Sequence, residues 1–122
     1  MKQWAPLAFA LILSACGSAP ADDAPAPPVA PLDATAQEAR FKGCSARHDA
    51  FTQLGVIKHG GARPGVDPDA WENLTEAEQR EVFDIAACLA SGGQNSERIV
   101  TVVEAGTDRE IDTLRIANTR QF

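Results

Sequence analysis

The chain has 122 residues, with 11 basic and 17 acidic side chains and a formal net charge of −6. This acidic balance argues against a nucleic-acid-binding protein, because such proteins present a basic patch to the phosphate backbone. The length suffices for one small hydrophobic core, so we expect a single small domain preceded by N-terminal sequence that lies outside the domain.

The N-terminus has the pattern of a cleavable secretory signal. Lys2 gives a positive start, residues 7–13 are wholly apolar, and the letters SACG follow at 14–17. A positive start, a short apolar core and small residues at a cleavage point are typical of a signal peptide. The apolar run is also shorter than the about 20 residues that a membrane-spanning helix needs. The sequence therefore predicts a signal peptide at residues 1–15.

Residues 13–16, Leu-Ser-Ala-Cys, resemble the lipobox of bacterial lipoproteins. The resemblance covers about the first 16 residues and implies that a dedicated peptidase cleaves before Cys16. It further implies that the Cys16 thiol carries a diacylglycerol, with acyl chains such as palmitate that hold the protein to a membrane. Each buried methylene contributes about 0.8 kcal/mol, so several acyl chains make release slow. Gly17 after the cysteine resembles an outer-membrane sorting signal, which implies the periplasmic face of that membrane.

Residues 16–31 are expected to form a disordered tether behind the lipid. After Cys16 the chain reads GSAPADDAPAPPVAP, which has one valine and no aromatic residue. Such a segment buries too little apolar surface to offset the entropy lost on folding. Its prolines favour an extended spacer of about 3.1 Å per residue. We expect the folded domain to occupy residues 32–122.

The first predicted element of the domain is a helix over residues 36–54. Thr35 and Glu38 have the spacing of a capping box, in which both side chains bind backbone N–H groups at a helix start. The helical period then places four side chains on one stripe: Phe41, Cys44, His48 and Phe51. Gly55 and the pair Gly60-Gly61 are expected to end the helix, and a loop rich in Gly and Pro is expected over residues 58–68.

A second long helix is predicted to end near Ala90. Thr75 and Glu78 form another capping box, and the apolar face that follows consists of Val82, Ile85, Ala86 and Leu89. Before it, Asp67-Pro68 is typical of a helix start, with Asp as the cap and Pro as the first helical residue. Asp69 alternates with Asp67 as in a calcium loop, but the remaining ligands of such a loop are missing. Trp71 is predicted to lie in the core beneath the loop.

The C-terminal segment is open to two interpretations. Residues 99–103 are β-branched and predict a strand, residues 105–108 a turn, and the alternation around Leu114 a returning strand. A third capping-box spacing at Thr107 and Glu110 supports a terminal helix instead. The sequence favours an α+β fold in which an antiparallel helix hairpin precedes a C-terminal β-hairpin, with a strand plus a terminal helix as the alternative.

Cys44 and Cys88 are expected to form a disulfide that links the two helices. An exported chain meets an oxidising compartment, and in an antiparallel hairpin the two positions differ in height by roughly 3 Å. The same residues with His48 and His59 are also zinc-type ligands, but we favour the disulfide. No arrangement of nucleophile, base and oxyanion donors stands out in the sequence. We therefore expect neither a metal or other cofactor nor enzymatic activity.

Charge is segregated along the domain. Residues 40–63 hold five basic side chains and one acid, whereas residues 67–84 hold seven acids and one arginine. We expect a non-enzymatic, lipid-anchored envelope lipoprotein that acts as an accessory or partner-binding component and binds another envelope protein. The alternative is an inhibitor of a cationic hydrolase such as lysozyme, which an unpaired acidic patch on the second helix would favour. The predicted partner-binding residues are Glu76, Glu78, Glu81, Arg109, Arg115 and Arg120.

Overall fold

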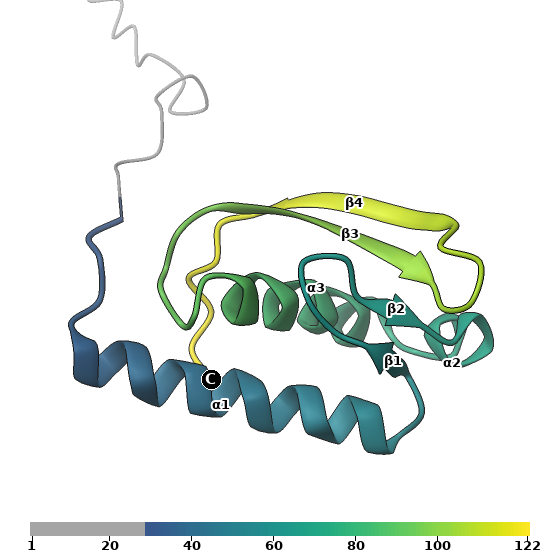
Figure 1. The fold of residues 1–122 in the computed structure, drawn as a ribbon, viewed down its shortest axis with the longest axis horizontal. Helices are drawn as coiled ribbons and strands as arrows, with labels where there is room; N and C mark the ends of the chain where they lie inside the picture. The colour runs from purple at the N-terminus through teal and green to yellow at the C-terminus, as the bar shows by residue number, and fades with distance from the viewer. Residues whose placement is uncertain (1–28) are drawn as a thin grey trace, which may run out of the picture.

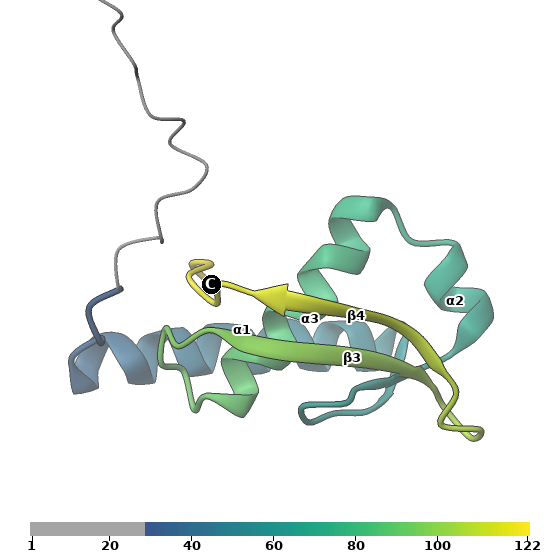
Figure 2. The same ribbon diagram turned by 90° about the horizontal axis from the view of Figure 1, so that it is seen from above.

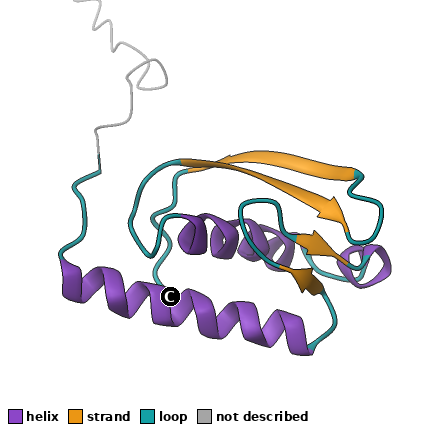
Figure 3. Cartoon of the chain, in the orientation of Figure 1, coloured by secondary structure: helices purple, strands orange, loops and turns teal. Residues whose placement is uncertain are grey.

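A computed structural model describes residues 29–122, so the predicted signal peptide, Cys16 and most of the predicted tether lie outside the described residues. The fold is mixed α+β, as expected, and Figures 1 and 3 show a sheet lying over two long helices. The elements in chain order are α1 (Ala34–Gln53), β1 (Ile57–His59), β2 (Gly65–Val66), α2 (Pro68–Glu72), α3 (Glu76–Ala90), β3 (Arg98–Glu104) and β4 (Glu110–Ile116).

The four strands form one sheet in the order β1-β2-β3-β4. β3 and β4 pair antiparallel, with Val100 opposite Leu114, so the predicted C-terminal strand pair is present and the alternative of a terminal helix is wrong. β2 pairs antiparallel with β1 and parallel with β3. β1 and β4 are therefore the two edges of the sheet.

The connection between the two long helices differs from the predicted loop. β1, β2 and α2 lie between α1 and α3 in the sequence, so the two packed helices are not the simple hairpin that we expected. A side chain on Gly65 would collide with the His59 ring, which lies across β2 at this point. The glycine therefore permits strand pairing in a segment whose Gly and Pro content indicated a loop.

The first helix begins earlier than predicted and buries a different side chain. Asp33, and not Thr35, caps α1, because the Asp33 carboxylate accepts a hydrogen bond from the Ala36 amide at 2.8 Å. Arg40 is buried, whereas Phe41, which was expected on the buried stripe, is 40% exposed. Cys44 and Phe51 of the predicted stripe are buried and His48 is partly buried, so the departure is that Arg40 takes the place of Phe41 on the buried face.

The two later helices follow the sequence signals. Asp67 caps α2 with Pro68 at its start, and Thr75 and Glu78 complete the predicted capping box of α3. α3 ends at Ala90, as expected, and the glycines that follow have positive φ angles (63° at Gly92 and 91° at Gly93). None of the described helices is long and apolar enough to cross a bilayer.

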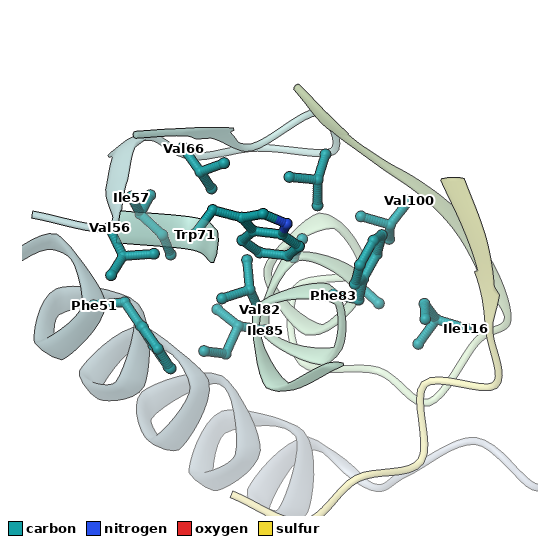
Figure 4. Close-up of a cluster of buried hydrophobic side chains, with 13 residues drawn as sticks. Phe51, Val56, Ile57, Val66, Trp71, Val82, Phe83, Ile85, Val100 and Ile116 are labelled. Carbon is teal, nitrogen blue, oxygen red and sulfur yellow. The ribbon is translucent and has the colours of Figure 1, made fainter. Parts of the chain in front are cut away.

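The core lies between the helices and the sheet, and Figure 4 shows its side chains converging from both layers. Trp71 packs edge-on against Phe83 with ring centroids 6.0 Å apart, which confirms the predicted core position of Trp71. The predicted Cys44–Cys88 disulfide is present and joins α1 to α3, with Cα atoms 6.3 Å apart. A covalent bond and an apolar cluster therefore hold the same pair of helices.

Candidate functional site

A groove of about 380 Å³ lies between the start of α3 and the outer strand β4. Figure 2 shows that α2 and the first turns of α3 project past the β4 side of the sheet. The groove lies in this offset, because β4 does not cover this part of the helix. The residues that line it are Trp71, Glu76, Gln79, Arg80, Phe83, Ile111, Asp112 and Leu114.

The floor of the groove is apolar and continuous with the core. Trp71 and Phe83 are 6% and 2% exposed, so most of each ring is held by its neighbours. Ile111 and Leu114 on β4 are partly buried and pack against the same cluster. On the α3 side of the groove, Gln79 Nε2 donates a hydrogen bond to the Trp71 carbonyl oxygen at 2.9 Å, which holds the Gln79 side chain in place. The floor is therefore a preformed surface.

The rim of the groove carries two carboxylates and one guanidinium. Arg80 Nε lies 3.6 Å from Asp84 Oδ1, one helical turn further along α3 and outside the residues that line the groove. Glu76 and Asp112 are exposed and have no ion-pair partner among the described residues. Arg80 is thus the one cation among the lining residues, and the rim favours a positively charged occupant.

The backbone of β4 beside the groove is available for hydrogen bonding. No other described strand pairs with the outer side of β4. The Thr113 amide donates to the Asp112 carboxylate at 2.8 Å, which indicates that this amide points away from β3. An edge strand of this kind is a template for pairing with a further strand. The groove therefore combines an apolar floor, an acidic rim and an unpaired strand edge.

Glu81 and Arg120, two of the predicted partner-binding residues, lie in an internal ion-pair network. Arg47 on α1 donates to both carboxylate oxygens of Glu81, at 2.7 and 2.9 Å. This hydrogen bonding lowers the pKa of the Glu81 carboxyl below its ordinary value. Arg120 also reaches Glu81 and bonds Asp84 at 3.0 Å. These acids of α3 therefore pair within the domain, with α1 and with the C-terminal segment.

The remaining predicted partner-binding residues are dispersed. Arg109 pairs with Glu104 at 3.1 Å, and Arg115 pairs with Glu97 at 3.3 Å. Glu78 is engaged in the capping box of α3. Of the six predicted residues, Glu76 is the one that lines the groove. The other five side chains lie in ion pairs or a helix cap outside the groove.

A buried polar hub around Arg40 was not foreseen in the sequence. Arg40 is 5% exposed, and its guanidinium donates to the carbonyl oxygens of Gly93, Gln94 and Arg120 and to the side-chain oxygen of Asn118. Burial lowers the pKa of Arg40, while the nearby Asp84 charge opposes this shift. Arg40 precedes Cys44 by one helical turn, and this shared face was the signal that could have placed it inside.

The Asn118 side chain completes the hub from the C-terminal segment. Its amide nitrogen donates to the carbonyl oxygens of Ala87, Gln94 and Ser96 and to the Ser91 hydroxyl. Asn118 is 2% exposed and has a φ angle of 63°, a left-handed conformation that asparagine tolerates better than most residues. The hub therefore fastens the chain after β4 to α1 and to the end of α3.

The four side chains of the alternative zinc site do not form one cluster. The disulfide consumes both thiols, and His59 lies across Gly65 on the sheet. His48 Nε2 is buried without a hydrogen-bond partner, and its Nδ1 lies 3.7 Å from Asp49. Within residues 29–122 no group of three or more potential metal ligands is present.

Known proteins offer no template for the groove or the hub, so both are interpreted from their own chemistry. Comparison of the chain with protein families, curated proteins and solved structures finds no match.

Proposed function

We propose that this protein is a non-enzymatic, lipid-anchored lipoprotein of the cell envelope that binds another envelope protein through the groove between α3 and β4. The observation that carries the proposal is the edge of β4, which pairs with no further strand among residues 29–122, beside a preformed apolar floor. Charged side chains on a strand edge limit indiscriminate association, and β4 carries Glu110, Asp112 and Arg115. An edge of seven residues next to a groove is therefore suited to binding a protein segment of matching charge.

The position of the tether supports this use of the groove. Leu32 exchanges hydrogen bonds with the side chain of Gln94, and Ala30 accepts one from Asn95. These contacts lie just beyond the end of α3, whereas the groove lies at its start, and a helix of 15 residues is about 22 Å long. Figure 1 shows α2 at the far side of the domain from the start of α1. An anchor on Cys16 therefore leaves the groove remote from the point where the tether joins the domain.

The lipid anchor itself is tested on the exported protein. Wild type should yield a mature N-terminal peptide that begins at Cys16 and carries acyl mass. Cys16→Ser should yield no acylated peptide and should leave the membrane fraction. A wild-type protein with an unmodified N-terminus after cleavage elsewhere would contradict the anchor.

The binding function is tested by photo-crosslinking in intact cells. A photoreactive residue in place of Glu76 at the groove should capture a protein of defined mass. The matched control carries it in place of Glu38, an exposed acid on α1 that pairs only with Lys42 among the described residues. Capture from neither position would contradict the proposed function. Equal capture from both positions, or capture of the same protein by an unrelated lipid-anchored protein, would also contradict it.

The alternative of an inhibitor of a cationic hydrolase is favoured by the unpaired carboxylates of Glu76 and Asp112. It is weakened by Glu81, whose pairing with Arg47 removes one acid from the predicted patch. A lysozyme assay distinguishes the two functions, because an inhibitor would slow lysis of cell-wall substrate in proportion to its concentration. Unchanged lysis together with capture at Glu76 would support the accessory function.

A further inference from the structure

We infer that the groove receives an extended segment of the partner protein, with at least one basic side chain, which pairs with β4 as a fifth strand of the sheet. The inference rests on the proposed function and gives the chemistry of the bound segment. It combines three features of the groove: the backbone of β4, the apolar floor and the acidic rim.

The backbone favours an extended occupant over a helical one. β4 offers the outward groups of a seven-residue strand, whereas β1 at the opposite edge has three residues and lies beside α1. A strand that pairs with β4 would lie about 4.8 Å from it, over the groove. The Thr113 amide now donates to the Asp112 carboxylate, and a carbonyl of the incoming strand would replace this carboxylate as its acceptor.

The floor sets the side-chain pattern of the segment. In a strand, successive side chains point to opposite faces, so every second one would point toward Phe83 and Leu114. Apolar side chains at these positions would cover the exposed remainder of the floor. The alternate positions would face solvent beside Thr113 and Arg115, which are both exposed. An alternating apolar and polar segment therefore fits the groove.

The rim sets the charge of the segment. Glu76 and Asp112 flank the groove from opposite sides, and Arg80 is held by Asp84. A lysine or arginine at a groove-facing position, next to the apolar ones, would meet Glu76 and Asp112, which form no ion pair within the described residues. Charge complementarity of this kind raises the association rate and discriminates between partners.

The same charges disfavour two other occupants. The predicted tether has Asp22 and Asp23 as its charged residues and is rich in proline, which lacks the N–H needed for strand pairing. β4 of a second copy has two acids, Glu110 and Asp112, and one base, Arg115, so it would bring a net negative charge to the acidic groove. A basic segment of a different protein remains the best fit.

The inference is tested with defined peptides on the mature, lipid-anchored protein in detergent. The proposed cleavage before Cys16 removes Trp4, so Trp71, which lines the groove, is the single tryptophan and the fluorescence reporter. The probe is a capped heptapeptide in which threonine alternates with valine, valine and lysine, so that the two valines and the single lysine share the face that would point into the groove. One control has glutamate in place of the lysine, and a second has N-methyl groups on the amides of one edge. We expect the lysine peptide to bind at least about tenfold more tightly than either control, because the first control loses the charge pair with the rim and the second loses hydrogen bonds to β4.

Variants of the protein assign the effect to the groove. Glu76→Lys, and separately Asp112→Asn, should weaken binding of the lysine peptide, and Glu76→Lys should also reduce its advantage over the glutamate peptide. Glu38→Lys makes the same charge change outside the groove and should leave both affinities unchanged. Amide hydrogen exchange at Thr113 should slow in the presence of the lysine peptide.

Each remaining outcome overturns a defined part of the inference. Equal binding of the N-methylated peptide would contradict strand pairing, and equal binding of the glutamate peptide would contradict the acidic rim. A dimer that protects the Thr113 amide without peptide would make a second copy the occupant. If no peptide binds but crosslinking captures a partner in cells, the inference fails while the proposed function stands; if both fail, neither stands.

Discussion

The two ends of α3 are built from different kinds of interaction. At its end, the Cys44–Cys88 disulfide and the Arg40–Asn118 hub join α1, α3 and the C-terminal segment through a covalent bond and buried hydrogen bonds. At its start, the groove is held by apolar packing, and its rim charges have few partners among the described residues. Buried hydrogen bonds therefore hold the end of α3 in place, whereas at its start the rim carboxylates form no ion pair within the described residues.

The tether therefore joins the domain near one end of α3, and the proposed binding groove lies at the other end. Local opening is easiest where few buried contacts and few internal hydrogen bonds hold the backbone. The hub end also receives residues 30–32, so a load on the tether would act on the more extensively bonded part of the fold. The groove end is free to exchange its solvent and side-chain contacts for a bound segment. Substitutions at the two ends should therefore have unequal effects on stability.

The largest effect is expected from loss of the disulfide. The cysteines are 44 residues apart, and the chain-entropy model gives about 4 kcal/mol for a closed loop of this length. Cys44→Ala with Cys88→Ala should lower the free energy of unfolding by that order, as measured by urea denaturation. Reduced wild type should resemble the double variant, and an unchanged midpoint on reduction would show that the hub end does not depend on the bond.

Arg40→Met should cost about 3 kcal/mol, because it leaves several buried carbonyl oxygens without a donor. Arg47→Met is the matched control and should cost less, since Arg47 is half exposed and Arg120 remains within 3.8 Å of Glu81. Equal losses in urea denaturation would contradict the assignment of Arg40 as the organising residue of this end.

Two substitutions at Asn118 should separate backbone conformation from hydrogen bonding. Asn118→Gly keeps the left-handed φ accessible and should cost about 2 kcal/mol through the lost hydrogen bonds. Asn118→Ala loses the same bonds and adds roughly 1 kcal/mol for the unfavourable φ. Thermal unfolding should rank wild type above the glycine variant and the glycine variant above the alanine variant; a reversed order would refute the strained backbone.

A smaller, pH-dependent effect is expected at Glu81. Its pKa is lowered in the folded protein, mainly by the hydrogen bond from Arg47, relative to an unfolded value of about 4.3. The pair therefore stabilises the fold above about pH 5, and this contribution is lost as the pH falls through the lowered pKa. Glu81→Gln should reduce the difference in unfolding free energy between pH 7 and pH 3 by about 1 kcal/mol. An unchanged difference would mean that other carboxylates govern acid stability.

The smallest effect on stability is expected at the groove. Glu76 is exposed in the first turn of α3, where a carboxylate contributes about 0.3–1 kcal/mol through the helix dipole. Glu76→Lys should therefore change the unfolding midpoint little while it weakens binding of the lysine peptide. A large loss of stability would remove the contrast between the two ends of α3.

The sequence predicts local structure well in α3 and poorly around β1 and β2. The bounds of α3 follow from a capping box, an apolar stripe and a glycine stop within one segment. β1 and β2 have three and two residues, and β2 exists through parallel pairing with residues 103–104, far along the chain. No local sequence pattern encodes a pairing between segments so far apart. The Gly65 that permits this pairing lies in a segment whose glycines and prolines predicted a loop.

The candidate site shows the same limit. Trp71 and Glu76 were singled out in the sequence, but nothing near them indicated that residues 111–114 would face them across a groove. Arg40 was counted with the surface charges, because its neighbour Phe41 was the expected core residue. A buried arginine is recognisable once the carbonyl groups of Gly93, Gln94 and Arg120 are placed around it.

The Arg40 hub also has a consequence for the order in which the chain folds. Its hydrogen bonds join residues 53 to 80 positions apart, and such distant contacts form late because a long loop must close first. Until Gly93, Gln94, Asn118 and Arg120 reach it, the Arg40 guanidinium keeps water as its partner. The hub therefore closes only after the long loops between these residues have formed, and it is a late event in the folding of the domain.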